Sequence, residues 1–376
     1  MFTLNQAITA VANKPEFSVK DRGEYVVIDY NLNNKETFVG GTPEETDILI
    51  NLRGTTFDKQ SGKIIRLGYK KFFNYGEFPE QDKQISWNDL HVITQKLDGS
   101  LIFPIYAASG TILGTRAGVT DVSMLVDQWL NENKELKEMY DELIDVCKDE
   151  NVTPLFEFCS RKNRIVLDYP ETQLVLTGMR RITDGTMLSH DVLINLGKLY
   201  GIPVVKLHDP ITATGFYSFH QEVQDLENDE GIVVLFGNGH MLKIKSNDYC
   251  LKHKAVDGLK FEKDLFLMSL QGKLDDVLPL LSPEFAWRIK QHSDAFLSHV
   301  FDCSTALENE YEKFSTIVDQ KDFAIAIKAN KFQSMLFMRR KGVLSYELIL
   351  QYAIKQCSTQ DKARLLKEFI GFNAEY

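Results

Sequence analysis

A lysine, an aspartate and a glycine stand together in the pentapeptide Lys96-Leu97-Asp98-Gly99-Ser100. The run HVITQKL before the turn and the run LIFPIY after it predict two strands, so the pentapeptide is expected at a strand-to-strand turn. A lysine amine can act as a nucleophile there, but an ordinary lysine is almost wholly protonated at pH 7. Nucleophilic use of Lys96 therefore requires a lowered pKa, through burial or neighbouring cations. The alternative interpretation is a surface ion pair between Lys96 and Asp98 beside a glycine turn.

A second group of charged residues lies in a predicted hairpin that begins at Glu230. Asn238-Gly239 between two apolar runs is typical of a two-residue type I′ turn. Period-two alternation places Lys243 and Lys245 on one strand face, and the two-residue turn places Lys243 opposite Val234. Two cations and the Glu230 carboxylate on that face could bind a phosphate and lower the pKa of Lys96. The alternative is a solvated edge strand with an exposed ion pair.

Further charged residues lie within or at the ends of predicted strands. Glu157, in the run FEF, shares a strand face with Leu155 and Cys159. A carboxylate there is costly unless it is paired or bonded to a ligand, and the alternative is the solvent side of an edge strand. The cations at strand ends or turns are Arg53, Lys71, Arg116 and Arg180. Each of these cations, taken alone, could be a surface charge.

Motifs of several other enzyme classes are absent from the sequence. It contains no GxxxxGK[ST] loop, no GxGxxG after a strand, no HExxH and no GxSxG. The five cysteines are widely spaced without a CxxC pair, which argues against a zinc site and for a reducing compartment. No run of about 18 apolar residues and no signal-peptide pattern occurs. We therefore expect a soluble cytosolic protein.

The chain divides into two regions that differ in predicted secondary structure, and the candidate residues lie in the first. Residues 1–254 are rich in predicted strands, among them 24–32, 101–108, 155–160, 164–169 and 173–182, with helices at about 121–148, 187–199 and 215–227. This pattern predicts an α+β domain. Residues 255–376 are predicted to be helical throughout. The net charge is −11 before residue 251 and +1 after it, so bulk charge does not identify the partner.

Taken together, these segments resemble in order and spacing the covalent nucleotidyltransferase superfamily, the ligases and RNA-capping enzymes that form a lysyl-nucleotide. KLDGS resembles the nucleophile motif of that superfamily. The later motifs are matched by RAG (116–118), FEF (156–158), EGIVV (230–234) and KIK (243–245). The upstream NLRGTTF and KKFFN, with Arg180 and Tyr249, further resemble the RNA ligase 1 family of T-even bacteriophages. The likeness covers most of residues 45–250, and the departures are Leu52 before Arg53 and Arg116 where a lysine can stand.

The resemblance implies a fold and a reaction. The fold would be α+β, with an antiparallel-sheet nucleotidyltransferase (adenylation) domain at 1–254 and an all-α C-terminal domain at 255–376 for RNA or tRNA specificity. Lys96 would attack ATP to give lysyl-AMP, the AMP would pass to a 5′-phosphate RNA end, and a 3′-hydroxyl would seal the strand. The implied cofactors are ATP and Mg²⁺, with Mn²⁺ as a substitute. The implied substrate is nicked tRNA in RNA repair by a cytoplasmic monomer without a membrane partner, in the host cell if a phage encodes it.

The resemblance also implies which residues bind the phosphates. Lys243 and Lys245 would neutralise the α-phosphate as it becomes pentacoordinate. Arg53 and Lys71 would hold the distal phosphates.

The remaining site residues receive roles from the same resemblance. Glu157 would bind the ribose hydroxyls, and Arg116 would bind the sugar or the RNA end. Asp98 and Glu230 would hold Mg²⁺ through its water shell, because that ion dehydrates reluctantly. Tyr249 would shape the nucleotide pocket.

Two other functions stay open on the sequence alone. A DNA ligase or an RNA-capping enzyme would carry a small barrel of short strands after KIK, where this sequence predicts helices. A catalytically silent nucleotide- or RNA-binding module would not need every charged residue of the reaction, and this chain retains them all.

Overall fold

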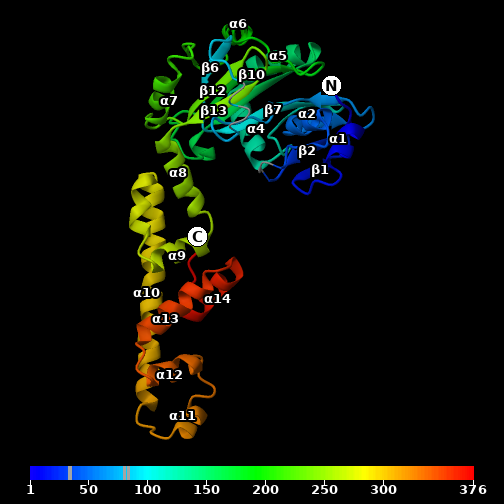
Figure 1. Cartoon of the computed structure of the whole chain (residues 1–376). Coiled ribbons are helices and arrows are strands. Elements are labelled where there is room, and N and C mark those ends of the chain that lie inside the picture. The colour runs from blue at the N-terminus through cyan, green and yellow to red at the C-terminus, as the bar shows by residue number, and fades with distance from the viewer. Residues whose placement is uncertain (33–35, 79–81, 83–84) are drawn as a thin grey trace. The chain divides into compact units, whose positions relative to one another are not determined.

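The computed structural model describes residues 1–32, 36–78, 82 and 85–376 (Figure 1). The chain divides into two compact units, Met1–Cys250 and Leu251–Tyr376. The first unit combines sheets with helices, and the second is built of helices. The expected α+β region followed by an all-α region is confirmed. No helix among the described residues is both long and apolar enough to cross a membrane.

The described part of the first unit contains three sheets, in which every neighbouring pair of strands is antiparallel except β13 with β5. The first sheet has the order β1 (Phe17–Asp21), β2 (Tyr25–Tyr30), β3 (Thr55–Asp58) and β4 (Ile64–Arg66). The second has the order β10 (Gln173–Arg181), β9 (Val152–Cys159), β7 (Ser100–Ala107) and β8 (Gly110–Gly114). The third has the order β11 (Leu207–His208), β6 (His91–Gln95), β12 (Gly231–Phe236), β13 (Met241–Lys245) and β5 (Phe73–Asn74).

Helices accompany these sheets. They are α1 (Leu4–Val11), α2 (Pro43–Asn51), α4 (Asp121–Glu132), α5 (Lys134–Asp149), α6 (His190–Tyr200) and α7 (Phe216–Gln224), while α8 (Asn247–Gly258) contains the unit boundary. The single helix expected over 121–148 is two helices. Asn133 separates them because its backbone, at φ −125° and ψ 73°, lies outside the helical region.

Helices cover one face of the second sheet, and the other face carries Glu157, one of the predicted site residues. Phe156 and Phe158 on β9 are fully buried in a core shared with α4, α5 and α6. The Tyr140 ring of α5 meets the Phe156 ring edge to face at 5.5 Å. Since side chains alternate along a strand, Glu157 points to the opposite face.

The third sheet is arranged in the same way. Ile232, Val234 and Phe236 alternate along β12 and are buried in a core that includes Val223 of α7. The opposite face of this sheet therefore carries the residues between them and the lysines of β13.

The β12–β13 hairpin closes with a three-residue loop, and the predicted two-residue turn is wrong. The Phe236 N–H donates to His240 O at 2.9 Å, and the Gly237 N–H is taken by Leu90 O at 2.7 Å. This tertiary contact brings Gly237 into the loop. Lys243 consequently pairs with Val233 instead of Val234. A one-residue slip exchanges strand faces, so the partner of Lys243 is the half-buried Val233, which lines the cavity described below, rather than the fully buried Val234.

The expected strand at 164–169 is absent, because the backbone donors of that segment have another partner. The Val166 and Leu167 N–H groups donate to the Asp98 carboxylate at 2.8 and 2.7 Å. Only a short 3₁₀ turn, Arg161–Asn163, forms between β9 and β10.

The second unit is a set of helices around the long helix α10, which Figure 1 shows in yellow with α11 to α14 in orange and red. Its helices are α9 (Glu262–Leu270), α10 (Pro283–Phe314), α11 (Gln320–Ala326), α12 (Gln333–Arg340), α13 (Ser345–Gln356) and α14 (Gln360–Ile370). Ser282 caps α10 and Pro283 occupies its first position, as helix starts favour. Phe266, Phe296 and Ile349 belong to its own buried core.

Candidate active site

The backbone around Lys96 is fixed by contacts that only glycine permits. The Lys96 N–H donates to Gly231 O at 2.8 Å. Gly231 has φ +126°, and a Cβ there would lie 2.1 Å from Ile244 O. A Cβ on Gly99 would lie 2.4 Å from Phe158 O. Strands β6, β9, β12 and β13 therefore meet at the lysine.

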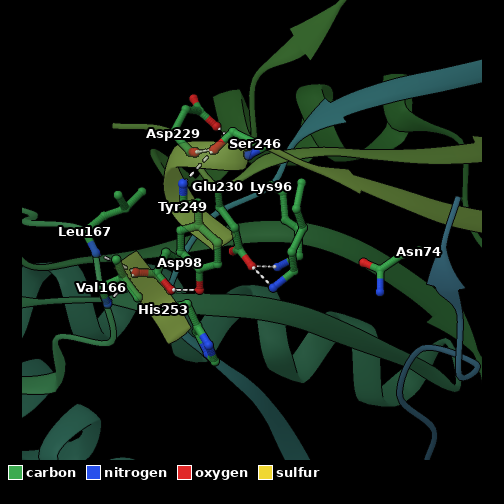
Figure 2. A network of polar contacts seen from close by, with 12 residues as sticks. Asn74, Lys96, Asp98, Val166, Leu167, Asp229, Glu230, Ser246, Tyr249 and His253 are labelled. Carbon is green, nitrogen blue, oxygen red and sulfur yellow. Dashed lines mark hydrogen bonds and ion pairs between the residues drawn. The ribbon is translucent and has the colours of Figure 1, made fainter. Parts of the chain in front are cut away.

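One buried carboxylate binds two lysines at this point. Glu230 Oε1 lies 2.7 Å from Lys96 Nζ and 3.0 Å from Lys245 Nζ. Figure 2 shows Glu230 pointing toward Lys96. The Glu230 side chain is only 4% exposed, so this carboxylate depends on its two partners. The structure thus brings together Lys96, Glu230 and Lys245, and the ion-pair partner of Lys96 is Glu230 rather than Asp98.

Asp98 is buried, and both of its oxygens accept hydrogen bonds from the protein (Figure 2). Oδ1 accepts from the Tyr249 hydroxyl at 2.7 Å, and Oδ2 accepts from the Val166 and Leu167 N–H groups. The Asp98 N–H donates to the Tyr169 hydroxyl at 3.0 Å. Asp98 therefore joins the lysine turn to α8 and to the segment after β9. These contacts do not support the expected role of Asp98 as a Mg²⁺ ligand.

Tyr249 belongs to this buried network instead of the cavity wall. It is 2% exposed, and its ring lies 4.7 Å from Lys245 Nζ. Tyr249 thus contacts Lys245 and Asp98 and is not among the residues that line the cavity, so it can shape the nucleotide pocket only through these two residues.

A cavity of about 440 Å³ opens beside Lys96 and is lined by residues of all three sheets and of the turns between strands. Its charged lining residues are Asp29, Arg53, Lys96, Arg116, Glu157 and Lys243. The sequence predicted all of these except Asp29. Phe72 also lines the cavity, with its ring 5.6 Å from the Arg53 guanidinium and 5.8 Å from Lys243 Nζ.

Two of the charged lining residues have pKa values near neutral pH. Burial, with further help from Lys71, Lys96, Lys245 and Arg53, lowers the pKa of Lys243 to about 7. Burial also raises the pKa of Glu157 to about 7, against the opposing effect of Lys96. The cavity therefore changes its charge within the physiological pH range.

Arg116 and Asp29 form a pair on the cavity wall. Arg116 Nη1 lies 3.4 Å from Asp29 Oδ1, and the guanidinium lies 4.5 Å from the Tyr30 ring. Burial raises the pKa of Asp29. An aspartate inside the apolar run YVVIDY was the sequence signal for this residue.

Lys71 lies among aromatic rings on the wall of a neighbouring cavity of about 550 Å³. Its Nζ is 4.5 Å from the Phe73 ring centroid, 5.9 Å from that of Tyr30 and 5.8 Å from that of Phe38. Burial lowers the pKa of Lys71 to about 8. The structure therefore does not place Lys71 on the same wall as Arg53.

A fully buried arginine that the sequence did not single out positions two of the site cations. Arg66 donates to Gly54 O at 2.8 Å and to Thr115 O at 3.0 Å. These carbonyls adjoin Arg53 and Arg116 in the chain. Arg66 thereby fixes the two turns that present the cations to the cavity.

Arg180, a predicted site cation, is a structural residue. It is 1% exposed and donates to Gly185 O at 2.9 Å, Gly68 O at 2.5 Å and Asn51 Oδ1 at 2.6 Å. All of its partners are protein oxygens, so it connects β10 to α2 and to the segment before Lys71.

The carboxylates do not form a metal cage. The part of the chain that the structure describes contains no group of three or more His, Cys, Asp or Glu residues able to hold an ion. Glu230 is bound by two lysines and Asp98 accepts three hydrogen bonds from the protein, which argues against either as a direct metal ligand. The expectation that they hold Mg²⁺ through its water shell stays a prediction. Asp29 and Glu157 are the carboxylates among the cavity-lining residues. Such a wall suits an ion that arrives on the phosphates of a ligand, as Mg²⁺ commonly does.

The chain matches a family model described as RNA ligase over residues 51–262. A Thermovibrio ammonificans protein provisionally assigned as an RNA ligase is 25% identical over 343 residues, which are 88% of this chain and 84% of that protein. A solved archaeal ATP-dependent RNA ligase is 14% identical, with a TM-score of 0.48 over 96% of this chain and 85% of that chain. A Naegleria gruberi RNA ligase mutant with ATP and Mn is 17% identical, with a TM-score of 0.40 over 50% of this chain and 57% of that chain. The chain thus spans little more than half of the Naegleria protein.

Proposed function

The chain belongs to the RNA ligase family, and from that membership we propose that it joins 5′-phosphate and 3′-hydroxyl RNA ends at the expense of ATP through a lysyl-AMP intermediate. The observation that carries the proposal is the position of Lys96. Its amine is bound to a buried carboxylate, Glu230, beside a cavity lined by Arg53, Arg116 and Lys243. Cations in that arrangement suit a polyphosphate whose α-phosphorus faces the amine.

In the first step Lys96 Nζ forms a bond to the α-phosphorus of ATP, and the bond from that phosphorus to pyrophosphate breaks. The amine must lose a proton, and we assign Glu230 Oε1, at 2.7 Å, as the acceptor. Lys243 and Lys245 would stabilise the negative charge that develops on the α-phosphate. Arg53 would hold the distal phosphates, and Lys71 would contribute from the adjacent cavity.

In the next two steps the AMP moves to RNA and then leaves. A 5′-phosphate oxygen of RNA attacks the adenylate, the phosphorus–nitrogen bond breaks and Lys96 regains its proton. The RNA 3′-hydroxyl then attacks the activated 5′-phosphorus, and AMP departs. Glu157 would bind the ribose hydroxyls, and Arg116, paired with Asp29, would bind the sugar or the RNA end.

A divalent cation, Mg²⁺ or Mn²⁺, would enter bound to ATP and neutralise phosphate charge. We assign Asp98 and Tyr249 to positioning the lysine turn. The family resemblance supports nicked tRNA as the substrate, selected by the helical unit, and a cytoplasmic monomer as the working form.

The experiment that tests this function follows covalent label. The protein is incubated with α-labelled ATP and Mg²⁺ after pyrophosphate treatment, and then separated on a denaturing gel. We expect label on the wild type and on Lys198→Ala, an exposed lysine of α6, and none on Lys96→Ala. Absence of label from the wild type would contradict an adenylating enzyme.

A second measurement separates the first step from the last. Lys96→Ala should still join RNA that carries a chemically attached 5′-adenylate, because that substrate bypasses the lysine. Loss of this activity in a folded variant would contradict the nucleophile role.

A further inference from the structure

The first unit is acidic, so a polyanionic substrate needs local cations to approach it. Residues 1–250 carry a net charge of −11. The densest basic run in them is Arg161-Lys162-Asn163-Arg164, with three cations in four residues. All three cationic side chains are exposed. This segment, which we term the basic turn, is the part of the first unit best suited to contact phosphates.

The basic turn lies at the rim of the candidate active site. It follows β9, the strand of Glu157, and Ser160 Oγ accepts the Lys162 N–H at 3.2 Å to start the 3₁₀ turn. Asn163 Nδ2 donates to Ser100 Oγ at 2.9 Å, and Ser100 lines the cavity beside Lys96. An RNA backbone bound at this turn would therefore lie beside the cavity that contains Lys96.

The segment is held rigidly on the lysine turn. The Asp98 carboxylate accepts the Val166 and Leu167 N–H groups, and Tyr169 receives the Asp98 N–H. The Arg161 guanidinium binds both oxygens of Asp168, at 2.7 and 2.8 Å. A preformed site loses little conformational entropy when it binds a ligand.

The charged groups of Lys162 and Arg164 are exposed, so that a ligand can reach them. Across residues 1–32, 36–78, 82 and 85–376, no ion pair of 4 Å or less involves either side chain. Arg164 Nε donates to Val166 O at 3.0 Å, which leaves the rest of the exposed guanidinium available. Arginine and lysine side chains of this kind bind phosphate oxygens without reading sequence.

We propose that the basic turn binds the phosphate backbone of the single-stranded RNA whose 5′-phosphate receives AMP. Lys162 and Arg164 contact two phosphates, and Arg161 holds the turn in place. The proposal rests on the proposed function and adds the surface by which the RNA donor end reaches Lys96.

The test compares two double variants that remove the same charge. Lys162→Gln/Arg164→Gln alters the basic turn, and Lys134→Gln/Lys148→Gln removes two exposed cations of α5, a helix that does not line the cavity. Fluorescence anisotropy measures binding of a 5′-phosphorylated 12-nucleotide RNA, without ATP, between 50 and 200 mM salt. We expect the basic-turn variant to bind about three- to tenfold more weakly at 100 mM salt, with a salt slope about 1.4 smaller, because each phosphate contact on a single strand contributes roughly 0.7. The α5 variant should keep the wild-type slope.

Equal slopes and affinities for the two variants would overturn the proposal. Self-adenylation with α-labelled ATP should proceed at the wild-type rate in both, and a loss confined to the basic-turn variant would also overturn it, since the turn would then serve the lysine and not RNA. A thermal unfolding midpoint within about 2 °C of the wild type is required of each double variant. If the basic-turn double variant falls below this range, Lys162→Glu, which changes the net charge by the same two units, takes its place and should also weaken RNA binding. A wild type that binds RNA through the turn but takes no label would contradict the proposed function and not this surface.

Discussion

Glu157 is a carboxylate that the fold holds at an energetic cost. Its pKa is raised to about 7 by burial, from an ordinary value of 4.5. Between these pH values the folded protein binds more protons than the unfolded chain, so stability falls as pH rises through that window. The cost is fully present above pH 7, where Glu157 is ionised in the fold. A ligand that donates hydrogen bonds to the carboxylate would offset it.

Glu157→Gln should therefore stabilise the ligand-free protein more at pH 8 than at pH 5. We expect a gain on the order of 1 to 3 kcal/mol in the free energy of unfolding at pH 8, since one pKa unit corresponds to about 1.4 kcal/mol, and a much smaller change at pH 5. Urea unfolding at the two pH values measures it, with Glu138→Gln on the exposed side of α5 as the control. A gain that is equal at both pH values would show that ionisation of Glu157 is not the cause.

The sequence alone identified most residues of the cavity but did not indicate what each one contacts. Lys243 and Glu157 followed from strand alternation, because a period of two determines the face. Arg66 and Arg180 look no different from surface arginines in the sequence, since their acceptors are distant. Arg66 reaches Thr115 O from 49 residues away. Asp98 was predicted to be a metal ligand because it lies close to Lys96 in the sequence. The sequence does not show that the N–H groups of Val166 and Leu167 donate to its carboxylate.

At the scale of the elements, the β12–β13 hairpin positions both lysines of the KIK motif. The assumed two-residue turn predicted that Lys243 pairs with Val234. The loop is one residue longer, because the Gly237 N–H donates to Leu90 O, and Lys243 pairs with Val233 instead. Tertiary contacts of this kind override turn chemistry and are invisible in a short sequence window. The two helices at 121–149 are a similar case, since only the backbone of Asn133 separates them.

Gly231→Ala should disrupt this hairpin. The added Cβ would approach Ile244 O to 2.1 Å at a φ of +126°, so we expect a loss of roughly 2 to 4 kcal/mol in the free energy of unfolding and a strong reduction of self-adenylation. Gly239→Ala is the matched control in the same hairpin. Gly239 has φ +81° and no atom within 4 Å of its Cβ position, so its cost should be about 1 kcal/mol. Urea unfolding measures both losses. Equal losses of stability in the two variants would contradict the contact described at Gly231.

At the scale of the whole molecule, each unit has buried cores of its own. Cores with Phe156 and with Ile232 lie within the first unit, and the core with Phe266 lies within the second. The change from strand and turn patterns to helical patterns in the sequence predicted two regions. The exact boundary was harder to predict, because α8 continues through it as one helix.

A chain that ends at Gly258, the last residue of α8, should fold and adenylate itself. It keeps Lys96, Glu230, Lys245 and every charged residue of the cavity. If the helical unit selects the RNA, this truncation should impair sealing of nicked tRNA at least tenfold more than sealing of generic single strands. Gel-based ligation of both substrates, with self-adenylation as the folding control, measures the difference. Equal losses would remove the specificity role of the helical unit.

Lys243 has a consequence for reagents as well as for substrates. Burial lowers its pKa to about 7, so a substantial share of its amines is neutral near pH 7.4, whereas an ordinary lysine is neutral in roughly one molecule in a thousand. Neutral amines are the form that activated esters acylate. Lys243 is therefore a natural handle for selective covalent labelling, and the degree to which a nucleotide shields it would report directly on occupancy of the cavity.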